Sequence, residues 1–264
     1  MSTTTLTAPT PADTADTAGV HARPGLGRLV AVELRKMIYT RAGFWLQVAT
    51  VAITVVAVIV ACVVGGAADL TFQSVLNVGL QPAAVLLPVV GILLVTSEWS
   101  QRTGLITFAL VPVRSRVLGA KLIASIVLAL ATLVMSVAVV AAGVLVASPG
   151  VDGTWSDAAP LIGQSAVYLT AGMVVGVALG MILLAPAPAI VVLFPLPTAW
   201  MAVVSLSFFA DIAPWVSTAR ALSPMQEEVM STTQWAQAGT ALALWMLLPL
   251  AVGAWRITRR EVTA

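Results

Sequence analysis

The chain has 264 residues, of which 59% are apolar and only 9% are charged. Soluble domains are roughly 45–50% apolar and about 25% charged, and so few charged residues cannot cover a water-facing surface of this size. The composition therefore excludes disorder, a coiled coil and a small disulfide scaffold, and it predicts an integral membrane protein.

The N-terminal part divides into a tail and a first helix. Residues 1–25 are rich in Thr, Ala, Pro and Asp and are predicted to form a disordered cytoplasmic tail. Residues 26–39 show an apolar 3.6-residue period, while their basic residues gather on the other side, which predicts an amphipathic helix lying in the inner membrane interface. The apolar positions are Leu26, Leu29, Val30, Leu34, Met37 and Ile38, and the basic ones are Arg28, Arg35 and Lys36.

Six later stretches are apolar and long enough to cross a membrane, for which a helix needs about 20 residues. They place residues 26–264 in one all-α domain of six transmembrane helices. Pro186 and Pro188 predict a tight hairpin between the fourth and fifth spans, and Pro195 and Pro197 predict a kink in the fifth. The predicted spans are residues 44–64, 80–97, 121–147, 164–185, 188–209 and 237–256.

The basic residues predict the orientation of these spans. If the N-terminus is cytoplasmic, every basic residue except Arg220 lies inside, and the opposite orientation reverses this distribution. Both termini are therefore expected in the cytoplasm. The 11 Arg against 2 Lys favour a GC-rich bacterial genome, and with it the bacterial plasma membrane.

Several kinds of chemistry lack candidate residues. The lone His21 lies in the tail, and the lone Cys62 lies within an apolar run, so no catalytic residue, metal site or cofactor site is predicted. The chain has no glycine-rich phosphate-binding loop. No charged residue lies in the middle of a span, which disfavours a secondary transporter without excluding it.

The loop of residues 97–121 carries the most informative pattern. Glu98, Trp99 and Arg102 lie within about one helical turn, and the apolar residues from Leu105 to Ala109 follow them. We expect a short cytoplasmic helix here, ended by Pro112, that offers a soluble partner a surface to bind.

At these residues the sequence resembles the permease subunits of ABC-2 type ABC transporters. The resemblance rests on Val32-Glu-Leu-Arg-Lys36, Glu98-Trp99, Thr103-Gly104, Pro112 with Arg114 and Arg116, and Lys121. It implies a permease that forms a homodimer, or a heterodimer with a second permease. It also implies a separate ATPase subunit, which binds ATP and Mg. It also implies that a coupling helix docks into that ATPase through Glu98, Trp99, Arg102, Thr103, Gly104, Leu105, Phe108 and Arg114.

Two further patterns bear on packing. Gly172, Gly176 and Gly180 repeat every four residues, which permits close helix approach, and packing inside the chain is favoured over a subunit interface. Residues 211–234 resemble the re-entrant outer segment of these permeases, although an ordinary interfacial helix fits nearly as well.

The leading hypothesis is a permease subunit of an ABC exporter. Few polar residues lie in the spans, so an apolar or amphiphilic substrate is favoured, and no nucleic-acid partner is expected. One alternative is a membrane subunit that transmits ATPase motion to another protein without moving a substrate. A secondary transporter is the other.

Overall fold

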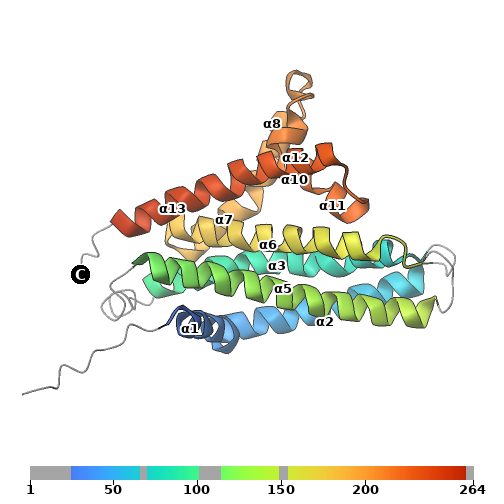
Figure 1. Cartoon of the computed structure of the whole chain (residues 1–264), viewed down its shortest axis with the longest axis horizontal. Helices are drawn as coiled ribbons and strands as arrows, with labels where there is room; N and C mark the ends of the chain where they lie inside the picture. Colours follow the sequence, from blue (N-terminus) through green and yellow to red (C-terminus); the bar gives the residue numbers. More distant parts are fainter. Residues whose placement is uncertain (1–24, 66–69, 101–113, 149–153, 260–264) are drawn as a thin grey trace, which may run out of the picture.

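The structure is a computed structural model, and it describes residues 25–65, 70–100, 114–148 and 154–259. All regular elements in these ranges are helices, and six of them are long and apolar enough to cross a membrane, as in a multi-pass membrane protein. The long helices run side by side along the longest axis of the molecule (Figure 1). The elements are α1 (Leu26–Tyr39), α2 (Arg41–Val64), α3 (Phe72–Ser100), α5 (Arg114–Ala147), α6 (Ala158–Leu183), α7 (Pro186–Leu193), α8 (Pro195–Val204), the 3-10 turn η1 (Ser207–Phe209), α9 (Ala213–Val216), α10 (Thr218–Leu222), α11 (Pro224–Glu227), α12 (Thr232–Leu242), the π-helical turn η2 (Ala243–Leu247) and α13 (Leu248–Arg259).

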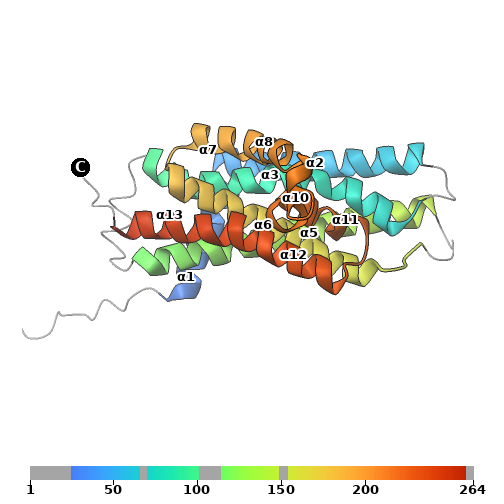
Figure 2. The same ribbon diagram turned by 90° about the horizontal axis from the view of Figure 1, so that it is seen from above.

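Helix α3 is the centre of the bundle. It packs against α2, α5 and α6 (Figure 2), and most of its membrane-spanning residues are buried, whereas few of those in α2 are. The buried side chains of α3 include Leu80, Leu87 and Ile92. Exposed apolar side chains such as those of α2 are compatible with contact with lipid, because lipid tails are as apolar as these side chains.

All six candidate spans in the described part of the chain begin earlier than the sequence predicts, and polar caps start two of the helices concerned, α3 and α12. Thr71 and Ser74 exchange backbone-to-hydroxyl hydrogen bonds of 3.2 Å, and α3 begins at Phe72 instead of residue 80. Ser231 and Gln234 form a capping box, and α12 begins at Thr232 instead of residue 237. Hydropathy alone does not register these first turns, because their residues are partly polar.

The proline predictions for the fourth and fifth spans are confirmed. The residue after α6, Leu184, has a left-handed φ of 56°, and α7 begins two residues later at Pro186, which makes a tight hairpin. Between α7 and α8 the chain breaks at Phe194, directly before Pro195. Helix α8 then leaves the bundle and carries η1 away from it (Figure 1).

The three repeated glycines of α6 face α3. A Cβ atom on Gly176 would lie 2.0 Å from the carbonyl oxygen of Pro88, and one on Gly180 would lie 3.1 Å from that of Ile92. Gly172 has looser surroundings, since its nearest neighbour is Pro88 Cγ at 3.5 Å. The glycines thus contribute to packing within the chain, where α3 and α6 approach closely.

This contact predicts opposite effects for two glycine-to-alanine changes in α6. Gly176→Ala should destabilise the protein by about 1–3 kcal/mol, because its methyl group meets backbone of α3. Gly163→Ala, which has nothing within 4 Å, should stabilise it by about 0.5–1 kcal/mol through helix propensity. Thermal unfolding of both variants in the same detergent measures the difference, and equal midpoints would contradict the close contact.

Candidate functional site

The ends of three helices meet at one end of the bundle. Helix α1 lies across the C-terminal part of α3 and the N-terminal part of α5, which flank residues 101–113 (Figure 1). The corner between α1 and α2 is tight, since a Cβ atom on Gly43 would lie 1.9 Å from Met37 O, and Thr40 Oγ1 accepts a 3.2 Å hydrogen bond from Gly43 N. This corner holds α1 against the bundle.

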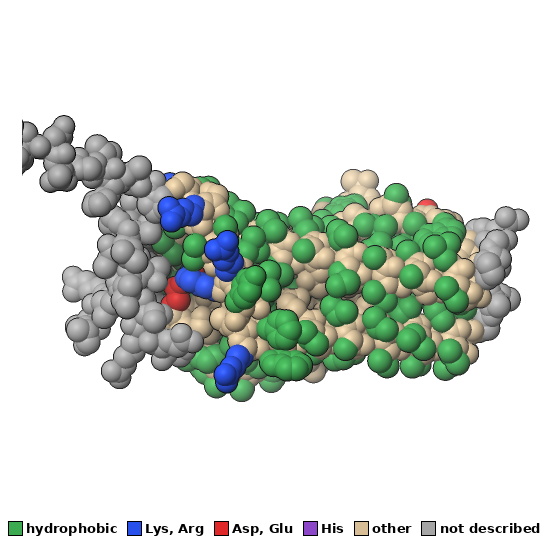
Figure 3. All heavy atoms as spheres, turned by 90° about the horizontal axis from the view of Figure 1, so that it is seen from below, with side chains coloured by type: hydrophobic (Ala, Val, Ile, Leu, Met, Phe, Trp, Pro, Cys, Tyr) green, Lys and Arg blue, Asp and Glu red, His purple; other side chains and the backbone are tan. Residues whose placement is uncertain are grey.

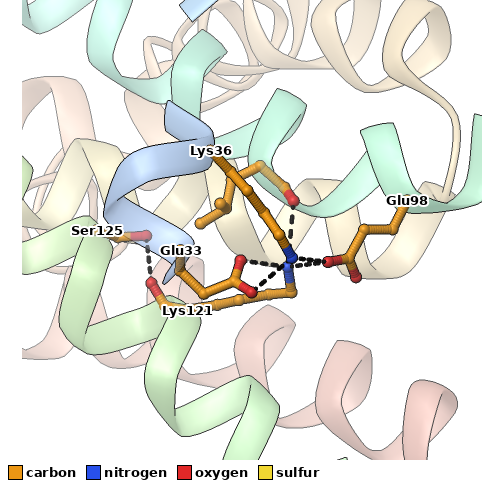
Figure 4. A network of polar contacts seen from close by, with 6 residues as sticks. Glu33, Lys36, Glu98, Lys121 and Ser125 are labelled. Atoms are coloured by element: carbon orange, nitrogen blue, oxygen red, sulfur yellow. Dashed lines mark hydrogen bonds and ion pairs between the residues drawn. The ribbon is translucent and has the colours of Figure 1, made fainter. Parts of the chain in front are cut away.

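Four charged side chains meet where these helices cross, and we call them the ion quartet: Glu33 and Lys36 of α1, Glu98 of α3 and Lys121 of α5 (Figure 4). Each lysine contacts both carboxylates. Lys121 Nζ lies 2.7 Å from Glu33 Oε2 and 2.9 Å from Glu98 Oε1. Lys36 Nζ lies 2.8 Å from Glu33 Oε1 and 2.7 Å from Glu98 Oε1.

The quartet is electrically balanced and largely hidden from solvent. Lys121, Glu33 and Glu98 are 3%, 4% and 7% exposed, whereas the side chain of Lys36 is about one-third exposed. Burial lowers the pKa of the Lys36 amino group, but its hydrogen bonds to Glu33 and Glu98 raise that pKa by more, so it ends above its ordinary value. Lys36 therefore stays charged at neutral pH.

Further contacts orient Lys121. Its Nζ also donates a 3.4 Å hydrogen bond to the carbonyl oxygen of Leu94, and Ser125 Oγ donates to the backbone oxygen of Lys121 at 2.7 Å. A buried charge pair is strongly destabilised when one member is removed, because the remaining charge loses its compensation. The quartet is thus a rigid link from α1 to both α3 and α5.

Sequence reasoning did not predict this cluster, although one signal pointed to it. Glu33 lies on the apolar stripe of α1, between Val30 and Met37, and an acidic residue in such a stripe requires a buried partner. All four residues belong to the stretches that carry the family resemblance. Their separation in the chain, 88 positions between Glu33 and Lys121, hides the contact from local patterns.

The predicted coupling residues are only partly described. Glu98 lies at the end of α3, where its carboxylate contacts Lys36 and Lys121. Trp99 and Arg114 belong to α3 and α5, but their side chains lie outside the described part. Arg102, Thr103, Gly104, Leu105 and Phe108 lie outside the described residues altogether, so the coupling helix and an Arg102–Glu98 pair stay predictions.

Basic side chains gather at this same end of the bundle. In the view of Figure 3, Lys and Arg lie near the end that holds α1, while the remaining surface is mainly apolar. The exposed members in α1 and α2 include Arg28, Arg35 and Arg41. The side of the membrane that this end faces stays a prediction of the charge rule.

A cavity of about 630 Å³ runs along α6 from Tyr168 to Ile182. Helices α3 and α6 form one wall, and α7, α8, α10, α11, α12, η2 and α13 contribute to the others. Most of its lining is apolar, and its polar side chains include Asn77, Gln81, Tyr168 and Gln226. This volume lies within the roughly 300–1,000 Å³ of pockets that bind drug-sized molecules.

Residues 211–234 fold back onto the bundle, and several of them line the cavity. Gln164 of α6 donates hydrogen bonds to the carbonyl oxygens of Met225 (3.1 Å) and Glu228 (2.8 Å), and its Oε1 accepts one from Met230 N (2.9 Å). Trp200 and Trp245 both donate to the carbonyl oxygen of Val216, at 3.0 and 2.7 Å. These bonds hold α9–α11 in place, but whether the segment re-enters a membrane stays a prediction.

Comparison with protein-family models and with curated proteins finds no match for this chain.

Removing Lys121 should weaken the fold markedly. Lys121→Met keeps a long apolar stem but leaves two buried carboxylates with one lysine, and we expect the free energy of unfolding to fall by about 3–5 kcal/mol. The matched control is Arg41→Met, which removes an exposed basic side chain at the same end and should unfold at the wild-type temperature. Equal unfolding temperatures for Lys121→Met and wild type would contradict the quartet.

Proposed function

We propose that this chain is the permease subunit of an ABC exporter in the bacterial plasma membrane, with both termini cytoplasmic. In this proposal it works as a homodimer or heterodimer, and a separate ATPase subunit binds ATP and Mg. The substrate is apolar or amphiphilic. The support is the resemblance at 32–36 and 98–121, together with the arrangement of the helices that carry these residues.

The ion quartet is the observation that carries the proposal. Residues 101–113 connect α3 to α5, and the quartet ties the flanking parts of both helices to α1 through Glu98, Lys121 and Glu33. In the proposed mechanism, an ATPase that moves residues 101–113 moves α1, α3 and α5 together. To pass this movement from one helix to the next, the contact between the helices must be rigid. A buried, charge-balanced network provides such a contact.

The composition of the bundle interior supports an apolar or amphiphilic substrate. In the described part of the chain, the buried charged residues are Glu33, Glu98 and Lys121. All three belong to the ion quartet, at one end of the bundle. Transporters driven by protons usually carry acidic or basic residues along the substrate path. The cavity instead offers mainly apolar walls with a few amide, hydroxyl and phenol groups, and its one charged lining residue in the described part of the chain is the exposed Glu227.

A second candidate is a membrane subunit that passes ATPase motion to another protein. Helix α8 and η1 extend from the bundle (Figure 1) and expose large apolar side chains, with Leu206 60% and Phe208 84% exposed. An exposed apolar tip of this kind can serve as a contact surface for a partner in the membrane. The experiment must therefore measure transport as well as ATPase assembly.

The test co-expresses the chain with the ABC ATPase that the proposal predicts to be encoded beside it. Purified alone, the chain should neither bind nor hydrolyse ATP, whereas the complex in proteoliposomes should hydrolyse ATP and move an apolar dye in an ATP-dependent way. Arg102→Ala should lower ATPase co-purification or uncouple hydrolysis from transport, because removing one partner of a desolvated charge pair costs about 2–5 kcal/mol. Arg28→Ala, a basic change in α1, is the control.

Each outcome separates the candidates. ATP turnover by the chain alone, after contaminants are removed, would contradict the split-subunit proposal. Assembly with the ATPase but no transport would favour the second candidate. Unchanged assembly and coupling in Arg102→Ala would contradict docking through this loop.

A further inference from the structure

The cavity is elongated along one face of α6. Tyr168, Gly172, Val175, Leu179 and Ile182 all line it, and their spacing of three or four residues is that of a single helical face. The fourteen helical steps from Tyr168 to Ile182 cover about 21 Å at 1.5 Å per step. The hydrocarbon core of one bilayer leaflet is about 15 Å deep, so this length suits one extended alkyl chain with its head group.

The two ends of the cavity differ in chemistry. Ile182 and Pro249 lie at the end nearer the ion quartet, where the lining is apolar. At the other end, Gln81 Nε2 donates hydrogen bonds to Asn77 Oδ1 (3.3 Å) and Gln226 Oε1 (3.2 Å). A molecule that fills this cavity therefore has one long apolar part and one polar end.

The amide of Gln226 is available to such a polar end. Its Nε2 is buried and lacks a hydrogen bond of ordinary geometry within the described residues, although the amide lies beside the phenol of Tyr168. A buried amide donor that is not fully satisfied is unfavourable, and a ligand that accepts its hydrogen bond removes this cost. Both Gln226 and Tyr168 line the cavity.

The charge at the polar end selects among head groups. Among the described residues that line the cavity, Glu227 is the one that carries a charge. Arg220 of α10 does not line it. A carboxylate beside the head-group position attracts a cation, tolerates a neutral group and repels an anion. The cavity thus combines a hydrogen-bond donor with negative charge.

We propose that this cavity binds a single-chain amphiphile with a neutral or cationic hydrogen-bonding head, the head lying at Gln226 and Glu227 and the chain along α6 toward Ile182. That the bound amphiphile is also the transported substrate rests on the proposed function. Binding itself does not, because all the residues involved belong to this chain.

The test is photolabelling of the full chain in nanodiscs, without ATP or ATPase. The probes are an alkyl amide, an alkyl amine and an alkyl carboxylic acid of equal chain length, each with a diazirine at the end remote from the head, used at a pH where the acid is ionised. We expect the amide and amine to label residues near Ile182 and Pro249, mapped by mass spectrometry. The acid should need about tenfold higher concentration than the amide to label the same residues to the same extent.

Matched variants assign the two ends. Val175→Trp fills the cavity and should abolish the deep labels, whereas Val167→Trp, on the exposed part of the same helix, should not. Glu227→Gln should bring the acid close to the amide in potency. Its neighbour Glu228 does not line the cavity, so Glu228→Gln should leave the order of labelling potency among the three probes unchanged. Gln226→Leu should weaken amide labelling about fivefold.

Three results would overturn the proposal: labels that persist in Val175→Trp, labels spread evenly over lipid-facing residues, or acid labelling as potent as amide labelling in the wild type. A failure of the proposed function looks different. If no ATPase assembles with the chain, the labelling pattern should still appear.

Discussion

The buried ion quartet is the interaction on which the arrangement of this bundle depends. Placing charges away from water is costly, and only close pairing offsets that cost. Here each lysine lies within 2.9 Å of oxygen atoms from both glutamates, so no charge is left with a single partner. Since the four residues come from α1, α3 and α5, the cost of separating any one helix includes an unpaired buried charge.

Apolar packing complements this polar link along the rest of the bundle. In lipid, helices are held together by close contact of small residues more than by the hydrophobic effect. Gly91 and Gly176 bring α3 and α6 together, and Gly79 and Gly143 allow Val58 of α2 to approach α3 and α5. The bundle is thus joined by charge at one end and by close backbone contact along its length, while the cavity occupies the region that α7, α8 and residues 211–234 leave open.

Much of the fold follows from the sequence, because lipid imposes strong local rules. Apolar length predicts six spans, and prolines predict the break before Pro195. The period of α1 predicts its bounds, Leu26–Tyr39. Helix starts such as Thr71 and Ser231 escape hydropathy because their caps are polar.

The candidate site was less predictable. The quartet depends on contacts between segments distant in sequence, although Glu33 on an apolar stripe signals that a buried partner exists. The cavity depends on how residues 211–234 fold back, which Gln164 and Val216 decide through tertiary hydrogen bonds. No local pattern encodes those bonds. The family resemblance located the relevant residues, but it did not indicate that Glu98 contacts Lys36 and Lys121.

The most direct test of the central claim measures whether the quartet holds α1 to α5. Spin labels at Val32→Cys and Ser115→Cys, both exposed, in a Cys62→Ala background report the distance between the two helices in nanodiscs by pulsed electron paramagnetic resonance. With the quartet intact, the distance distribution should be single and narrow. Glu33→Gln, which keeps the side-chain shape and removes one charge, should broaden it, and an unchanged narrow distribution in Glu33→Gln would contradict the account.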